Sequence, residues 1–194
     1  MLIARSHSAS RLRILRRSLL VIGVILSGRS CLAASQPSQS DVEAVYLFDF
    51  GKFVRWPAGL EPGPLHICVA GSESFAAELE KTVANENING RALLVRRVFH
   101  AEEESGCAML FIDATEREHA ADLLAGVADK PTLTVSELND FLERGGMIQF
   151  QLVGKRVRFS INLDAVRRGH LAMSSELLKV ALTVKGRALD GGVQ

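Results

Sequence analysis

The middle of the sequence alternates short strand-like segments with amphipathic ones, and this alternation limits the fold more than any other feature. Four segments have the length and residue content of strands: 65–70, 93–99, 107–112 and 132–135. Apolar residues at helical spacing occupy 75–83 and 120–127. Three shorter helices are expected at 137–144, 163–169 and 176–182. Strands and helices that alternate over short loops predict a single α/β domain with a central mixed, mostly parallel sheet flanked by helices.

The last third of the chain predicts a C-terminal antiparallel hairpin. Segments 147–152 (MIQFQL) and 156–161 (RVRFSI) alternate apolar and polar residues on either side of a turn. The core-facing residues would be Ile148, Phe150, Leu152, Val157, Phe159 and Ile161. The other face carries Gln149, Gln151, Arg156, Arg158 and Ser160. That polar face suits plain surface, with contact to an acidic ligand or partner as the alternative.

A first helix is expected over 42–56, capped by Ser40 or Asp41 and stopped by Pro57. Its apolar arc contains Val42, Val45, Tyr46, Leu47, Phe50, Phe53, Val54 and Trp56, whereas Ala44, Gly51 and Arg55 fall outside it. Asp49 lies inside this arc, so it is expected either to be satisfied locally or to sit at the rim of a pocket. Glu43 lies there too, in the first turn, where an acidic residue suits the helix dipole.

The N-terminal segment 1–34 predicts an export signal. Five arginines precede the short apolar run SLLVIGVIL at 18–26, and small residues at 33–34 offer a cleavage site. The run is too short to span a bilayer. A twin-arginine signal at 16–17 and a lipidated Cys31 are alternatives. Cleavage would leave a polar leader at 35–40, a domain at 41–185 and a flexible tail at 186–194, in a secreted protein.

Removal of this signal changes the charge of the chain. All 22 acidic residues but only 17 of the 23 basic ones follow residue 34, so the remaining chain has a formal net charge of −5. Such a balance argues against a nucleic-acid partner. The two remaining cysteines, Cys68 and Cys107, indicate a disulfide in an oxidising compartment, with two buried free thiols as the alternative.

No catalytic signature is present in the sequence. It contains no phosphate-binding loop, no nucleophile elbow, no HExxH, and no metal-ligand spacing among its histidines. We therefore expect no enzyme activity, no metal and no cofactor. The candidate partner- or ligand-binding residues are Asp49, Arg55, Trp56, Arg158, Asn162, Arg168 and His170.

Several segments, in this order and spacing, carry a resemblance to a known family. They are AVYLFDFGKFVRWP (44–57), LHICVAG (65–71), NINGRALLVRR (87–97), CAMLFI (107–112), LTVSE (133–137), GGMIQFQLVGKRVRFSINLDAVRRG (145–169) and MSSELLKVAL (173–182). Together they resemble the YfiR-like family of secreted bacterial proteins over about 42–184. Asp49, Arg55 and Ser160 depart from the residues usual there, which bears on the identity of the partner.

The resemblance implies a periplasmic α/β domain, frequently dimeric and without catalysis, in which Cys68 and Cys107 match a family disulfide. It implies binding to the periplasmic sensor region of a membrane diguanylate cyclase, whose repression an outer-membrane lipoprotein relieves. The protein would then set cyclic-di-GMP and biofilm-related behaviour. A different expectation is a periplasmic small-ligand carrier or sensor without a cyclase partner. Its pocket would lie at the carboxyl ends of the strands, rimmed by Asp49 and Trp56.

Overall fold

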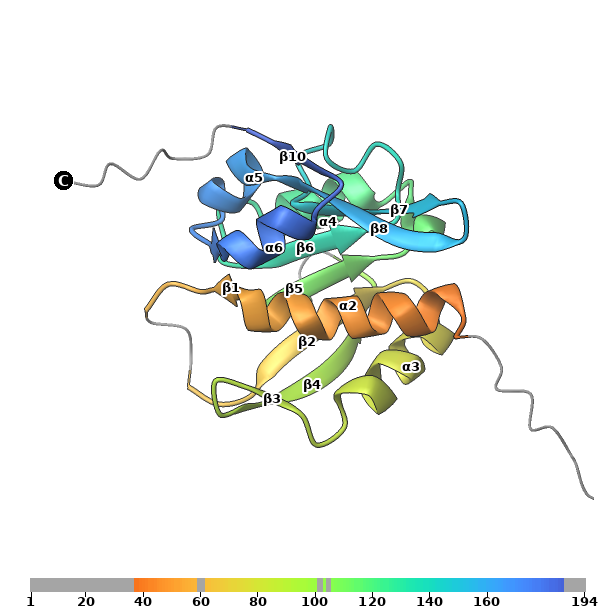
Figure 1. Ribbon diagram of the computed structural model, residues 1–194. Coiled ribbons are helices and arrows are strands. Elements are labelled where there is room, and N and C mark those ends of the chain that lie inside the picture. Colours follow the sequence, from red (N-terminus) through yellow and green to blue (C-terminus); the bar gives the residue numbers. More distant parts are fainter. Residues whose placement is uncertain (1–36, 59–61, 101–102, 104–105, 187–194) are drawn as a thin grey trace, which may run out of the picture. The chain divides into compact units, whose positions relative to one another are not determined.

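The computed structural model describes residues 37–186, except 59–61, 101–102 and 104–105 (Figure 1). The expected export signal lies outside the described residues, as do the first two residues of the leader and most of the tail.

An eight-stranded sheet in the order β10-β8-β7-β6-β5-β2-β4-β3 forms the centre of the described part. Its strands are β2 (Leu65–Ala70), β3 (Asn87–Ile88), β4 (Arg91–Val98), β5 (Cys107–Ile112), β6 (Leu133–Ser136), β7 (Ile148–Val153), β8 (Arg156–Asn162) and β10 (Thr183–Lys185). The pairs from β4 through β7 are parallel, whereas β8 returns antiparallel to β7. The mixed, mostly parallel sheet and its C-terminal hairpin are therefore confirmed.

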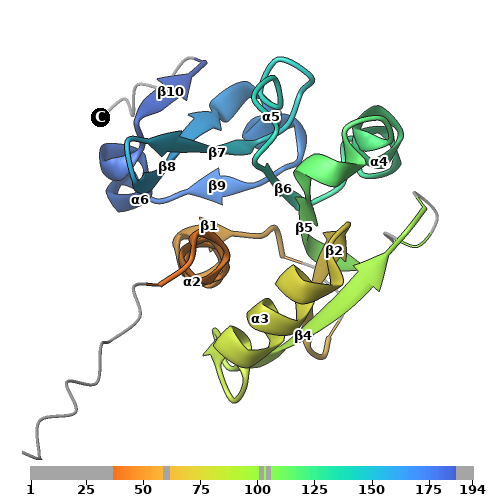
Figure 2. The ribbon, with the colours of Figure 1, turned by 90° about the vertical axis from the view of Figure 1, so that its right-hand side faces the viewer.

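Both faces of the central strands are buried, which explains why these strands are continuously apolar rather than alternating. Ile67 and Val69 of β2 face the cluster that contains α2 (Gln39–Phe53) and α3 (Glu73–Val83). Cys68 and Ala70 face the other cluster, which contains α4 (Ala120–Gly126). Figure 2 shows α2 and α3 on one side of the sheet and α4 on the other.

The remaining elements lie after β5, after the hairpin, or at the end of α2. They are η2 (Ala114–Glu116), α5 (Leu163–Arg168), α6 (Ser175–Val180), and the two-stranded sheet of β1 (Val54–Arg55) with β9 (Ala172–Met173). Asn162 caps α5 and Ser174 caps α6. Strand β10 was not predicted, because its three residues are too few to show a periodicity.

Helix α2 differs from the prediction at both ends. It begins at Gln39, where Ser38 and Asp41 form a reciprocal capping box, and it ends at Phe53. Trp56 is therefore not part of the helix. The buried residues of α2 include Ala44 and Gly51, which the arc had left outside.

Close approach, rather than apolar content, decides which face of α2 is buried. Val45 is 49% exposed and Phe53 is 38% exposed, although both belong to the predicted apolar arc. A Cβ atom on Gly51 would lie 2.2 Å from Ile88 Cδ1, so any larger residue at this position requires the Ile88 side chain or the helix to move. The small side chains at 44 and 51 thus select the buried face.

Two further predictions on the C-terminal half are wrong. The segment 137–144 forms successive turns instead of a helix. Leu152, expected in the core, is 58% exposed because it lies at the turn end of the hairpin. The polar face of the hairpin is not plain surface throughout, since Gln149 and Ser160 are buried.

Candidate functional site

The carboxyl ends of the parallel strands gather three acidic residues. Asp113 follows β5, Glu137 follows β6, and Glu43 comes from the second turn of α2; we call these three the carboxyl-end cluster. Gln39 bridges two of them, since its Nε2 donates to Glu43 Oε1 at 2.8 Å and to Glu137 Oε2 at 3.3 Å. Asp113 Oδ1 accepts hydrogen bonds from the backbone N and Oγ1 of Thr115, both at 2.8 Å.

Glu43 is the most perturbed member of this cluster. Glu43 is only 2% exposed, and burial raises the pKa of its carboxyl from 4.5 to about 7. The hydrogen bond from Gln39 opposes this increase, while Glu137 and Asp113 add to it. Burial likewise raises the pKa of Glu137. The sequence placed Glu43 inside the apolar arc, but its burial was missed because the helix dipole offered a sufficient explanation.

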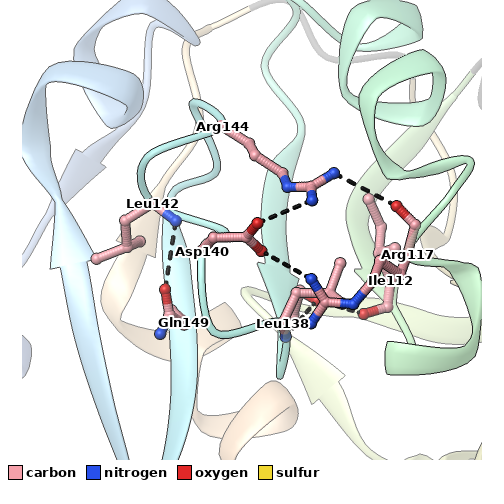
Figure 3. A network of polar contacts seen from close by, with 8 residues as sticks. Ile112, Arg117, Leu138, Asp140, Leu142, Arg144 and Gln149 are labelled. Carbon is pink, nitrogen blue, oxygen red and sulfur yellow. Dashed lines mark hydrogen bonds and ion pairs between the residues drawn. The ribbon is translucent and has the colours of Figure 1, made fainter.

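The loop between β6 and β7 closes the same end of the sheet (Figure 3). Leu142 N donates to Gln149 Oε1 at 3.4 Å, which gives the side-chain oxygen of this buried residue on the polar face of the hairpin a partner. Asp140 pairs with Arg144 at 2.8 Å and with Arg117 at 3.5 Å. The hydrogen bond from Arg144 holds the pKa of Asp140 below its ordinary value. Side chains of the molecule itself thus occupy the carboxyl ends.

A cavity lies instead at the amino ends of the parallel strands. This amino-end cavity of about 400 Å³ is lined by Arg55, Trp56, Pro57, Leu65, Ile88, Asn89 and Arg91. Trp56 is held there by a hydrogen bond from its Nε1 to Ala108 O, 3.2 Å away. The structure therefore brings together two predicted site residues, Arg55 and Trp56, but at the opposite end of the strands from the expected pocket.

A second cavity separates the start of α2 from the turn end of the β7–β8 hairpin. This hairpin groove of about 470 Å³ is lined by Pro37, Ser38, Gln39, Val42, Tyr46, Leu152, Gly154, Lys155, Arg156, Val157 and Arg158. It contains the predicted site residue Arg158. The sequence did not place Val42 or Tyr46 beside it, since they lie more than a hundred residues away in the chain.

The other predicted site residues line neither cavity. Asp49 is half-buried on α2 and pairs with Lys52 at 2.5 Å, so it is satisfied locally. Asn162 caps α5 through its side-chain oxygen and donates from Nδ2 to Leu142 O at 3.1 Å. Arg168 and His170 are exposed near the end of α5.

The two cysteines form a disulfide between β2 and β5. Cys68 and Cys107 are both buried, with their Cα atoms 5.8 Å apart. This confirms the predicted disulfide and excludes the alternative of two free thiols in this structure. Within the described residues, no group of three or more His, Cys, Asp or Glu side chains is arranged to hold a metal ion. The described helices also include none with the length and apolar character needed to cross a membrane.

Comparison with known proteins places the chain among relatives of the same fold. A family model described as YfiR/HmsC-like matches residues 40–182. A conserved domain protein from Vibrio cholerae superposes with a TM-score of 0.50 at 12% identity, over 78% of this chain and 62% of the other. A Streptococcus pneumonia protein described as an ABC domain in complex with L-Trp superposes with a TM-score of 0.50 at 14% identity, over 75% and 60%. This chain therefore matches about three-fifths of each solved protein, and at these identities the likeness concerns the fold alone.

Proposed function

This chain belongs to the YfiR/HmsC-like family, and from this we propose that it is a periplasmic, non-enzymatic regulator. It binds the periplasmic sensor region of an inner-membrane diguanylate cyclase and represses that enzyme, and so controls cyclic-di-GMP and biofilm-related behaviour. The observation that carries the proposal is the family match over 40–182. The Cys68–Cys107 disulfide supports an oxidising compartment such as the periplasm.

A regulator of this kind acts through differential affinity. It represses by binding the inactive conformation of the cyclase more tightly than the active one, and the ratio of the two affinities limits the shift it can produce. An outer-membrane lipoprotein that competes for the regulator would relieve the repression. In this proposal the regulator works as a homodimer, as the family resemblance implies.

The proposal is tested by deleting the gene and measuring cellular cyclic-di-GMP. Loss of a repressor raises the cyclic-di-GMP concentration, and expression of the wild-type chain from a plasmid lowers it again. An unchanged concentration after deletion, with every cyclase gene intact, would contradict the proposal.

The amino-end cavity favours a second candidate function, the binding of a small periplasmic ligand. It combines the exposed cation of Arg55, the indole of Trp56 and the amide of Asn89 around a volume typical of small-molecule sites. Ligand binding to the folded state raises the melting temperature by mass action. Thermal unfolding with periplasmic metabolite fractions, for wild type and for Arg55→Ala, checks this candidate; equal shifts in both proteins would argue against this cavity.

A further inference from the structure

The cations of the hairpin groove are not used inside the molecule. Lys155, Arg156 and Arg158 line the groove, and within the described residues none of their side chains forms a hydrogen bond or an ion pair. No carboxylate lines the groove. Elsewhere, basic residues such as Arg144, Arg167 and Lys185 are paired with acidic neighbours. The groove therefore presents uncompensated positive charge to another molecule.

The floor of the groove is formed by an aromatic ring that packs against core aromatic residues. Tyr46 is half-buried, and its ring centroid lies 5.8 Å from that of Phe50, 6.0 Å from Phe150 and 5.6 Å from Phe159. Its hydroxyl has no hydrogen-bond partner within the described part of the chain. Leu152 adds an aliphatic side chain that is 58% exposed at the rim. An apolar side chain could rest on this floor without any rearrangement of the core.

Strand β8 has an open edge along the residues that line the groove. On one side, β7 pairs with β8 along the whole hairpin, from Ile148↔Ile161 to Val153↔Arg156. On the other side, β10 pairs with β8 only at 160–162. Among the residues that the structure describes, 156–158 therefore have no strand neighbour on this second side. An extended peptide can add to such an edge through main-chain hydrogen bonds.

We infer that the hairpin groove docks an extended acidic segment of the partner protein, with an apolar side chain that rests on Tyr46. The inference rests on the proposed function and names the surface that carries it out. Charge complementarity selects an acidic segment, since three cations and no carboxylate line the groove. A membrane surface fits less well, because the open edge of β8 at 156–158 offers main-chain hydrogen bonds that a peptide can use and a lipid layer cannot.

A fluorescence titration with a defined probe tests the inference directly. The probe is a short fluorescein-labelled peptide in which glutamate alternates with valine around a central phenylalanine, and the protein is the chain from residue 35 onwards. We expect saturable binding that weakens with added salt. The double variant Lys155→Glu/Arg156→Glu, which changes two exposed side chains, should raise the Kd by roughly tenfold or more.

Two controls separate groove binding from general charge effects. Lys130→Glu/Lys179→Glu reverses two exposed lysines outside the groove and changes the net charge equally, so it should leave the Kd within about twofold. A peptide with lysine in place of glutamate should not bind. Absence of binding by the wild type, or equal weakening by both double variants, would overturn the inference. Groove-dependent binding of phosphatidylglycerol vesicles that matches peptide binding would overturn it in favour of a lipid surface.

Complementation of the deletion strain distinguishes this inference from the proposed function. If wild type and the Lys130/Lys179 variant restore low cyclic-di-GMP but the Lys155/Arg156 variant at equal abundance does not, the groove is the repressing surface. If all three restore it, the groove inference is overturned while the proposed function stands. If the wild type changes nothing, the proposed function fails, and the peptide titration alone decides whether the groove binds acidic segments.

Discussion

The carboxyl-end cluster and the hairpin groove are opposite in charge and in exposure. The cluster holds three carboxylates that are hydrogen-bonded by Gln39, Thr115 and the backbone of Ala114. The groove holds three cations that are unpaired within the described residues and stay open to solvent or half-buried. Charge that is buried and satisfied within the molecule changes its stability, whereas exposed unpaired charge remains available to a partner.

Helix α2 connects these two regions. Gln39 lines the groove and also donates hydrogen bonds to Glu43 and Glu137 of the cluster. The two regions should therefore respond differently to mutation. Changes at the cluster should alter the free energy of unfolding, whereas changes at the groove should alter the affinity for a partner.

The largest expected effect on stability comes from removing the disulfide between β2 and β5. Strand β5 leads into Asp113 of the carboxyl-end cluster. Cys68→Ala/Cys107→Ala opens a loop with a sequence separation of 39 residues. The chain-entropy argument gives a loss of about 4 kcal/mol in the free energy of unfolding. Urea denaturation measures the loss. Peptide affinity per folded molecule should be unchanged, since neither cysteine lines the groove. A loss of unfolding free energy below about 1 kcal/mol would show that the unfolded chain is already constrained without the disulfide.

Glu43→Gln should remove most of the pH dependence that the cluster imposes on stability. The pKa of Glu43 is about 7 in the folded state, against an ordinary value of 4.5. Between these two values the unfolded chain releases the proton while the folded chain keeps it, so the free energy of unfolding falls as pH rises through this window. The fall amounts to about 3 kcal/mol above pH 7.

The measurement is urea denaturation of wild type and Glu43→Gln at a series of pH values. The two proteins should be equally stable at about pH 4, and the variant should be more stable by about 3 kcal/mol at about pH 8. In the variant, Glu137 should leave a smaller decrease of stability with rising pH, because its pKa is also raised. Glu86→Gln at an exposed position serves as the matched control. A variant with the wild-type pH profile would refute the assignment to Glu43.

The sheet could be predicted from the sequence more completely than the site. β2 and β5 were recognised as continuous apolar runs because both of their faces are buried. The buried face of α2 could not be predicted from the helical spacing of its apolar residues alone, since it also depends on the close contact between Gly51 and Ile88. The arginines at 156 and 158 were recognised as a polar set, but their groove depends on Tyr46, which only the tertiary fold brings beside them.

Gly51→Ala tests whether the close contact of α2 with Ile88 contributes to stability. The added Cβ would lie 2.2 Å from Ile88 Cδ1 and 3.4 Å from Met109 Cε, so the helix or its neighbours must shift. Overpacking of this kind costs about 1–3 kcal/mol, part of which the better helix propensity of alanine offsets. Thermal unfolding measures the cost. The double variant Gly51→Ala/Ile88→Val removes the clashing methyl group and should recover stability relative to the sum of the single changes; strict additivity would contradict the clash.

The smallest effect on stability is expected at the rim of the groove. Leu152 is 58% exposed, so Leu152→Ser should change the free energy of unfolding by less than about 0.5 kcal/mol. The same change removes an aliphatic contact for the docked segment and should weaken peptide binding severalfold. Val153→Ser, at an exposed neighbour that does not line the groove, is the matched control and should leave the Kd unchanged. Equal affinities for wild type and both variants would restrict the role of the groove to its cations, whereas a large loss of stability would mean that Leu152 belongs to the core after all.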